Sequence, residues 1–318
     1  MSTRRNEIRR IRTVIQYPQS RRSRNRFVGL LADGMGAHGV ATGAFHDLSA
    51  RMPTFSDAMV LHWPENLLQR NSLIAVPLAS RMLSYLERSQ DAGTTVIWFL
   101  HNSLRRDLSD HSGLTRLVNV VDGFVYLTNS SRTRFSELPA KPSVVVPHPR
   151  YRVGCVPVAN RTVKNILFWD RSDIERKISW LARGGRSVWV RSGDADAGSP
   201  GVDVLPRRTS ETDLNRLLGS GTVVIIDRFR INSGMVFHAV AQGARVLVVA
   251  SPESEEVADS VGRDWVDTFA EKEWCHHHFF RSVAPNQTPS LDERDPAVVG
   301  RQLLNFMEDC SRTKGLEL

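Results

Sequence analysis

The sequence predicts an α/β protein with two domains, each built around a parallel sheet. Short apolar runs typical of buried strands alternate with segments of helical periodicity, which is the pattern of βαβ units. This alternation restarts after residue 163, just beyond Pro149, Gly154 and Pro157. The length of 318 residues is sufficient for two domains with separate cores.

The expected elements follow the apolar runs in order. The first half predicts strands at 12–17, 58–62, 94–100, 123–127 and 143–146, and helices at 25–38, 66–90 and 114–121. Pro77 should kink the longest of these helices. The second half predicts strands at 164–169, 187–191, 202–205, 222–226 and 244–250, and helices at 173–183, 210–218, 233–242 and 297–309. The pattern of 251–295 favours neither element type.

These elements predict four segments. They are a basic N-terminal tail at 1–11, a first sheet domain at 12–157, a second sheet domain at 158–295, and a terminal helix and tail at 296–318.

The positive charge is confined to the beginning of the chain. The net charge is +8, and the first 26 residues hold nine arginines and one acidic residue, Glu7, so the remainder is neutral. A basic folded face, which nucleic-acid binding requires, is therefore not indicated. The arginines could instead contact an anionic membrane surface, or they could form a solvated tail.

Composition excludes several other classes of protein. We find no apolar run long enough to span a membrane and no apolar segment typical of a secretory signal. Three widely spaced cysteines fit a reducing compartment better than a disulfide framework. We therefore expect a cytoplasmic protein, with peripheral attachment to the inner face of the plasma membrane left open.

Four polar motifs each follow an apolar, strand-like run. They are His62-Trp63-Pro64-Glu65, His101-Asn102, Pro147-His148-Pro149-Arg150-Tyr151 and Asn232-Ser233-Gly234. In open parallel sheets, ligands bind outside the carboxyl ends of the strands. The motifs therefore predict an enzyme site assembled from distant parts of the chain.

The first two motifs supply candidate side chains for acid–base chemistry. Pro64 should hold Trp63 in an extended conformation and place Glu65 in the first turn of a helix. Glu65 could act as a general base, while His62 or His101 could bind a hydroxyl or stabilise charge. Spacing alone also allows structural roles, in which the histidines are satisfied at strand ends and Glu65 serves the helix dipole.

The fourth motif predicts an anion site at a helix beginning. Small residues at a helix N-terminus expose N–H groups at the positive end of the dipole, an arrangement that suits a diphosphate. Arg230 could add positive charge. The segment is neither a GxGxxG nor a Walker A loop, so a dinucleotide or ATP is poorly supported.

Taken together, the motifs resemble those of the GT-B glycosyltransferases, in particular bacterial exopolysaccharide and glycolipid sugar transferases. The resemblance rests on Asn25-Arg26-Phe27, His62–Glu65, Trp98–Asn102, Pro147–Tyr151 and the run from Ser233 to Val246, in matching order and spacing. It implies two Rossmann-like domains that face a cleft, with the acceptor on the first domain, the nucleotide-sugar on the second, and a C-terminal helix that crosses back.

The resemblance also implies roles for individual residues. His101 would face the donor sugar, with Glu65 and His62 as the other catalytic candidates. The donor side would comprise Ser233, Gly234, Met235, Arg230, Asp227, Trp169, Arg171 and His238. The acceptor side would comprise Trp63, Asn25, Asn102 and His148.

The expected reaction is hexosyl transfer from a GDP- or UDP-sugar to a glycan or glycolipid hydroxyl in polysaccharide or glycoconjugate biosynthesis. The nucleotide-sugar is a substrate, and we expect no cofactor and no metal. Cys275-His276-His277-His278 has no second ligand pair at a zinc-like spacing.

A second hypothesis rests on Trp169-Asp170-Arg171, which replaces the glycine loop of the relatives. Under this hypothesis the chain is a catalytically degenerate GT-B protein that binds a sugar nucleotide or a partner without turnover.

Overall fold

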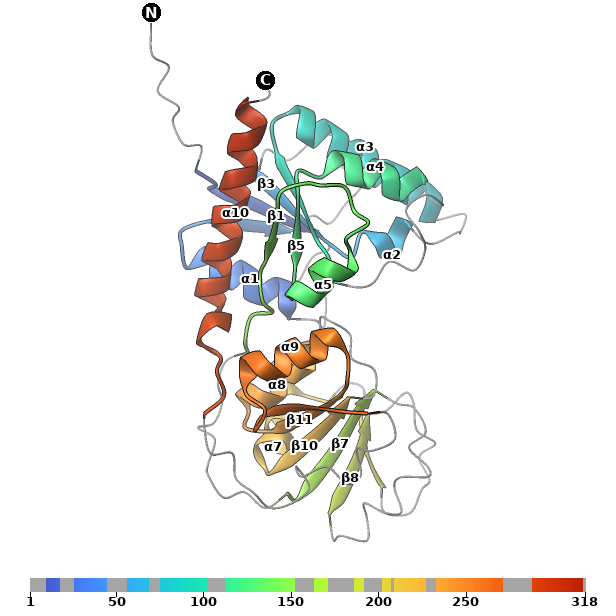
Figure 1. The fold of residues 1–318 in the computed structure, drawn as a ribbon, viewed down its shortest axis with the longest axis vertical. Coiled ribbons are helices and arrows are strands. Elements are labelled where there is room, and N and C mark those ends of the chain that lie inside the picture. Colours follow the sequence, from blue (N-terminus) through green and yellow to red (C-terminus); the bar gives the residue numbers. More distant parts are fainter. Residues whose placement is uncertain are drawn as a thin grey trace, which may run out of the picture. The chain divides into compact units, whose positions relative to one another are not determined.

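The computed structural model divides the chain into two compact units. Unit 1 comprises 1–149 and 293–318, and unit 2 comprises 150–292. The structure describes residues 10–17, 26–44, 56–68, 75–101, 112–151, 163–170, 186–191, 202–206, 209–226, 233–270 and 288–316. Each unit contains one six-stranded sheet in which every pairing is parallel (Figure 1), which confirms the predicted α/β class.

The sheet of unit 1 has the order β2-β1-β3-β4-β5-β6. Its strands are β1 (Thr13–Tyr17), β2 (Ala41–Ala44), β3 (Ala58–His62), β4 (Thr95–Phe99), β5 (Gly123–Tyr126) and β6 (Ser143–Val145). The chain builds outward from β1 to β2, then reverses to β3 on the other side of β1. Adjacent β1 and β3 therefore form the topological switch point, where open α/β sheets bind ligands.

Helices cover both faces of this sheet, as parallel strands require. They are α1 (Phe27–Gly36), α2 (Glu65–Leu68), α3 (Ala75–Asp91), α4 (Ser112–Val120), α5 (Asn129–Arg134) and α10 (Pro296–Leu316). Figure 1 shows α1 and α10 on one face and α3 and α4 on the other. Central strands β3 and β4 are buried along their whole length, which explains their continuous apolar sequences.

Several predictions for unit 1 need correction. The expected single helix at 66–90 is described as two elements, α2 and α3, and Pro77 falls in the first turn of α3. Proline is tolerated there because the first N–H groups of a helix have no partner within it. Strand β2 and helix α5 were not predicted, since β2 has the weakly apolar sequence ATGA and α5 the polar sequence NSSRTR.

The terminal helix α10 belongs to unit 1, far in sequence from most of it. It packs against α1, where Gly34 and Gly300 bring the two backbones together. A Cβ atom on Gly34 would collide with the carbonyl of Pro296, and one on Gly300 would collide with the backbone of Gly34. His38 and the carbonyl of Ala297 lie 2.7 Å apart at the same crossing. The predicted return of the C-terminal helix is therefore observed within unit 1.

Unit 2 has the strand order β12-β11-β10-β7-β8-β9. Its strands are β7 (Asn165–Asp170), β8 (Ser187–Arg191), β9 (Val202–Leu205), β10 (Thr222–Ile226), β11 (Arg245–Val249) and β12 (Val266–Phe269). Its described helices are α7 (Glu211–Gly219), α8 (Gly234–Ala241), α9 (Pro252–Val261) and the 3-10 turn η4 (Asp292–Arg294) at the boundary with unit 1. The switch point of this sheet lies between β7 and β10.

The uncertain segment 251–295 contains α9 and β12. Ser251 caps α9 through a capping box with Ser254, and Pro252 occupies the first helical position. Strand β12 lies at the edge of the sheet, with its first and last residues buried and the two between them half-buried. The helix predicted at 173–183 lies outside the described residues.

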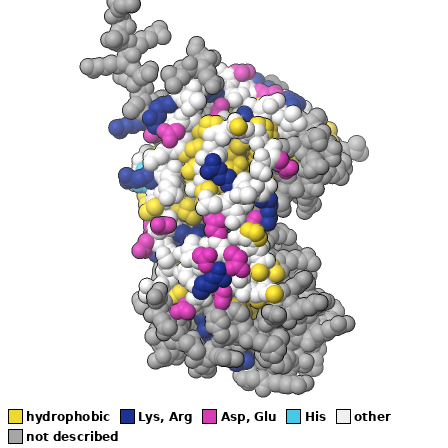
Figure 2. Space-filling view, in the orientation of Figure 1, with side chains coloured by type: hydrophobic (Ala, Val, Ile, Leu, Met, Phe, Trp, Pro, Cys, Tyr) yellow, Lys and Arg dark blue, Asp and Glu magenta, His cyan; other side chains and the backbone are white. Residues whose placement is uncertain are grey.

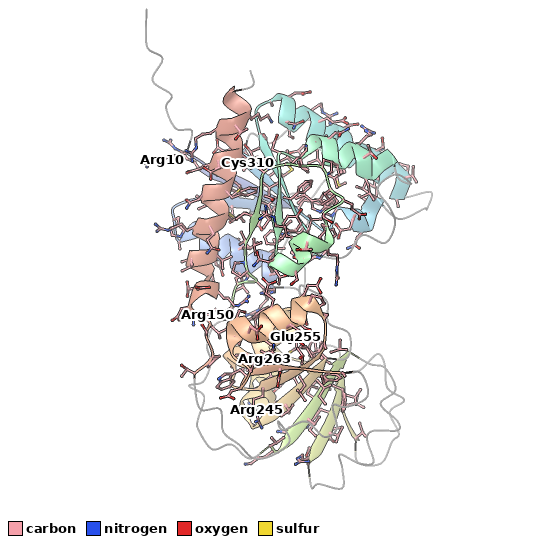
Figure 3. All side chains as sticks on the ribbon, viewed as in Figure 1. Arg10, Arg150, Arg245, Glu255, Arg263 and Cys310 are labelled. Carbon is pink, nitrogen blue, oxygen red and sulfur yellow. The ribbon has the colours of Figure 1, made fainter. Side chains whose placement is uncertain are left out.

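Charged side chains of both signs lie on the face drawn in Figure 2. On the face drawn in Figure 2, the Lys and Arg side chains are scattered rather than gathered in one basic patch. In unit 2, Arg263 forms ion pairs with Glu255, Asp259 and Asp267, and Figure 3 shows Glu255 and Arg263 side by side. These exposed pairs contribute little to stability.

Candidate functional site

Three of the predicted histidines lie together at the carboxyl end of the unit 1 sheet. His62 is the last residue of β3, His101 follows β4 by two residues, and His148 follows β6 by three. All of these strands are parallel, so their carboxyl ends meet at one edge. The rings of His62 and His101 have centroids 5.2 Å apart, and the ring of Phe27 contacts all three histidine rings.

A chain of hydrogen bonds runs through this edge. Nδ1 of His62 lies 2.9 Å from Nε2 of His101, and Nε2 of His62 lies 3.0 Å from Oε1 of Gln16. Gln16 in turn donates from Nε2 to the carbonyl oxygen of Val28 at 3.3 Å. Gln16 stands on β1 and His62 on β3, so this chain crosses the switch point of the sheet.

Aromatic rings enclose the imidazole of His101. Trp63 stacks on it with centroids 4.4 Å apart and an interplanar angle of 26°, and Phe99 stacks at 4.8 Å and 13°. Phe27 meets the same ring edge-on at 4.7 Å. Stacked and edge-to-face pairs of this kind hold ring orientations beyond what burial alone would achieve.

The backbone of Trp63 differs from the prediction. The residue has φ 55°, in the left-handed region, whereas Pro64 was expected to hold it extended. Trp63 is the one non-glycine residue with positive φ in the described part of the chain. Left-handed backbone at such a residue costs about 1–3 kcal/mol and persists where the surroundings enforce it. The turn places the Trp63 ring against His101, so tertiary contact overrides the local preference.

Burial keeps these histidines neutral. Desolvation lowers the pKa of His62 to about 3, and it lowers the pKa of His101 far below the usual value, with His62 and His148 adding repulsion. Desolvation also lowers the pKa of His148 to about 3, with a further contribution from Arg294, although its bond to the Pro149 carbonyl acts in the opposite direction. Near neutral pH the cluster therefore offers uncharged donors and acceptors and does not bind anions through positive charge.

The remaining candidate in the first motif is Glu65. It is the first residue of α2, and its exposed fraction is 2%. A carboxylate in the first turn interacts favourably with the helix dipole. The structure thus places Glu65 two residues from the Trp63 turn, while its role as a base stays a prediction.

In unit 2, Ser233, Gly234 and Met235 lie at the beginning of α8. Ser233 is the N-cap residue, yet its side chain makes no capping hydrogen bond, and the first turn contains no acidic residue. Helices α7 and α9 differ, because Ser210 and Ser251 cap them and acidic side chains occupy their first turns. Among these three described α-helices of unit 2, α8 is therefore the one with no acidic side chain in its first turn to offset the positive end of its dipole.

Trp169 and His238 occupy different surroundings. Trp169 lies in β7 next to the switch point, where the pairing of β7 with β10 is irregular at Ile226. His238 is one turn inside α8, with Nε2 2.6 Å from Oδ1 of Asn215 and its ring stacked on Tyr151. It is 8% exposed and contacts α7, so its described partners are protein side chains.

Gln16 and Phe27 carry much of the site geometry, and sequence reasoning gave Gln16 no role. The available signal was a polar residue inside the apolar run TVIQY, at the carboxyl end of the first strand. The candidates Asn25, Asn102, Arg171, Asp227 and Arg230 lie outside the described residues, as do Cys275–His278.

Within the described ranges, no three His, Cys, Asp or Glu side chains come close enough to hold a metal. In the same part of the chain, no helix is long and apolar enough to cross a bilayer.

Comparisons with known proteins identify the fold. No family model matches the chain, and no curated protein matches it. HepE of Anabaena, solved in complex with UDP and glucose, aligns with a TM-score of 0.54 and 11% identity over 97% of this chain and 100% of that chain. An alpha-glucosyltransferase, solved with UDP and a mismatched DNA, aligns with a TM-score of 0.54 and 8% identity over 94% and 93%.

A further match is the GtfA/B complex, with a TM-score of 0.45 and 10% identity. The alignment covers 79% of this chain and 57% of the matched chain of that complex. Two six-stranded parallel sheets and the alignments with HepE and the alpha-glucosyltransferase define the GT-B fold of the glycosyltransferases. The fold implied by the sequence motifs is thereby confirmed.

Proposed function

We propose that this protein is a glycosyltransferase that moves a hexose-type sugar from a UDP- or GDP-sugar to a hydroxyl of a glycan or glycolipid acceptor. The observation that carries the proposal is the alignment of nearly the whole chain with HepE, which was solved with UDP and glucose. The alpha-glucosyltransferase solved with UDP supports the same donor class.

The beginning of α8 supports a role for unit 2 in binding the donor diphosphate. The backbone N–H groups of Ser233, Gly234 and Met235 would stabilise the negative charge that grows on the leaving diphosphate. The first turn contains no carboxylate that would repel it. Trp169 lies in β7, next to the switch point of the sheet of unit 2.

The histidine cluster supports a role for unit 1 in binding sugar hydroxyl groups. Neutral imidazoles recognise hydroxyls without charge, and the Trp63 ring offers a flat apolar surface of the kind that sugars contact. Both ring nitrogens of His62 already lie within bonding distance of His101 and Gln16, so His62 is the weaker base candidate. Glu65 is the base we propose for an inverting reaction, and a retaining reaction would need none.

The proposed chemistry uses no metal, because the α8 N-terminus and basic side chains would supply the electrophilic stabilisation. We place the protein in the cytoplasm in bacterial polysaccharide or glycoconjugate synthesis. The arginine-rich first 26 residues would attract anionic lipid at the inner membrane face, which deletion of residues 1–11 and vesicle co-sedimentation would test.

The first experiment measures nucleotide binding by calorimetry with UDP, GDP and their sugar conjugates. The protein is expected to bind one nucleotide family. Gly234→Pro removes the first backbone N–H of α8. Proline is tolerated at the first position of a helix, as Pro252 shows in α9. Affinity should fall about tenfold or more, because a hydrogen bond to a charged group contributes roughly 1.5–3 kcal/mol.

The matched control is Glu211→Pro, at the first position of α7 in the same unit. It should leave nucleotide affinity unchanged. Absence of binding to every nucleotide at millimolar concentration would exclude the proposed donor class.

The second experiment measures transfer with mass spectrometry across glycan and glycolipid acceptors. Under the inverting mechanism, Glu65→Gln should reduce turnover by about a hundredfold or more, since a positioned base contributes roughly 10²–10⁴-fold. Glu253→Gln is the control, because Glu253 is another 2%-exposed carboxylate in the first turn of a helix. Full activity of Glu65→Gln would remove Glu65 from the role of base.

A further inference from the structure

The amide of Gln16 has a defined orientation. Its exposed fraction is 2%, and its two polar atoms face different partners. The Val28 carbonyl can only accept, so the atom of Gln16 that faces it at 3.3 Å must be the NH₂ group. The amide oxygen therefore faces Nε2 of His62, at 3.0 Å, and this nitrogen must donate.

That donor fixes the rest of the chain. A neutral imidazole carries one hydrogen, and burial keeps the pKa of His62 at about 3, so its hydrogen is on Nε2 and its Nδ1 is an acceptor. Nδ1 of His62 faces Nε2 of His101 at 2.9 Å. His101 must then donate from Nε2, which leaves Nδ1 of His101 as a bare lone pair.

This lone pair is buried without a partner. His101 has an exposed fraction of 0%, and its Nδ1 forms no hydrogen bond with any part of the chain that the structure describes. Trp63 and Phe99 stack on this ring and Phe27 meets it edge-on, which favours the observed ring plane. A buried acceptor left unpaired is unfavourable, so this nitrogen is suited to a group that donates a hydrogen bond.

We propose that Gln16 is a positioning residue which, through His62, holds His101 in the Nε2–H tautomer so that Nδ1 accepts a hydrogen bond from a ligand hydroxyl. The identity of that ligand as a sugar substrate rests on the proposed function. The tautomer itself does not, because it follows from contacts within unit 1. A site built this way discriminates strongly against an analogue that lacks the hydroxyl, since Nδ1 would stay unpaired.

The decisive measurement is ¹⁵N NMR of the histidine ring nitrogens in the full-length protein near neutral pH, with His101 assigned through His101→Gln. The expected spectrum shows Nε2 of His101 protonated and Nδ1 unprotonated. The opposite tautomer, or a doubly protonated ring, would overturn the proposal without reference to any activity.

The variant test uses Gln16→Met, which keeps the side-chain length and removes both hydrogen-bonding groups. The ratio of His101 tautomers should shift about fivefold toward Nδ1–H, which corresponds to the loss of one hydrogen bond of about 1 kcal/mol. Gln90→Met is the control, because Gln90 precedes the opposite end of β4 and its side chain donates a hydrogen bond to Asp122 that the same change removes. An unchanged His101 tautomer in Gln16→Met would also overturn the proposal.

Turnover separates this inference from the proposed function. If the protein transfers sugar, Gln16→Met should lower kcat severalfold and leave nucleotide affinity unchanged, while Gln90→Met changes neither. If the unsubstituted protein transfers no sugar to any acceptor, the proposed function fails, and the ring nitrogen signals still decide the tautomer.

Discussion

The candidate sites of the two units occupy equivalent places in their sheets but use different parts of the polypeptide. In unit 1, the polar groups of the candidate site belong to buried side chains: Gln16, His62 and His101 form a hydrogen-bonded chain inside aromatic rings. In unit 2, the polar groups of the candidate site are backbone N–H groups, since α8 begins with small residues and without a side-chain cap.

The difference follows from what each site offers. Desolvation removes charge from imidazoles, so the unit 1 cluster suits neutral hydroxyl groups. Backbone N–H groups keep their dipole at any pH, so the beginning of α8 suits an anion. The two candidate sites thus differ in kind, since the one in unit 1 is neutral and polar and the one in unit 2 lies at the positive end of a helix dipole.

Acidification should affect stability through the unit 1 site most strongly. The folded-state pKa of His62 and of His148 is about 3, below the ordinary value near 6.5. The unfolded state therefore binds more protons between these values, and stability falls as pH falls from 6.5 toward 3. Each histidine should contribute a loss of about 1.4 kcal/mol per pH unit.

Urea unfolding at pH 7, 6 and 5 measures this slope. His148→Gln should reduce the dependence of the unfolding free energy on pH by the contribution of one histidine, about 1.4 kcal/mol per pH unit. A free energy of unfolding that stays constant from pH 7 to pH 5 would show that the cluster is not buried in the neutral form.

Removal of the shared aromatic ring is the next largest test. Phe27 is fully buried and contacts the rings of His62, His101 and His148, so Phe27→Ala should cost about 3–5 kcal/mol. The equally buried Phe237 in α8 is the control, and Phe237→Ala should cost a similar amount. Only Phe27→Ala should change the His101 ring signals, and equal changes in both variants would contradict the assignment of Phe27 to the cluster.

The left-handed turn at Trp63 provides an intermediate test. Trp63→Asn and Trp63→Val both remove the ring that stacks on His101, but only Asn tolerates positive φ well. Trp63→Val should therefore be less stable than Trp63→Asn by roughly 1–2 kcal/mol. Equal unfolding free energies for the two variants would indicate that the backbone at this residue relaxes away from φ 55°.

The smallest expected effect concerns the serines at the helix beginnings of unit 2. Ser210 and Ser251 cap their helices, so Ser→Ala at either position should cost about 1 kcal/mol. Ser233 makes no such bond, so Ser233→Ala should change stability far less, and it should leave nucleotide binding unchanged because the backbone N–H is kept. Differential scanning calorimetry with and without nucleotide checks both statements, and a full capping cost at Ser233 would contradict the comparison.

Local sequence predicted the strands and most helices because their signals are local. The run AMVLH became β3 with the predicted bounds, and SVWVR became β8 in the same way. One long helix was predicted where the structure has α2 and α3, because a proline near a helix beginning has no distinctive local pattern. Strand β2 was not predicted, because a weakly apolar edge strand has no distinctive local pattern either.

The candidate site was predicted in part. His62, His101 and His148 were singled out and lie together in unit 1, because the carboxyl ends of parallel strands share one edge of the sheet. Gln16 was missed because its importance depends on β1 lying beside β3, and strand order is not a local property.

By itself, the sequence determined the α/β class, the two repeats of the sheet pattern and the chemistry available at the strand ends. Only the tertiary structure decided which strands are neighbours, and therefore that Gln16 meets His62 and that His62 meets His101. It also decided the positive φ of Trp63 against the preference of a residue before proline. Packing energies act between residues far apart in the chain, so they can override local preferences that no neighbouring residue reveals.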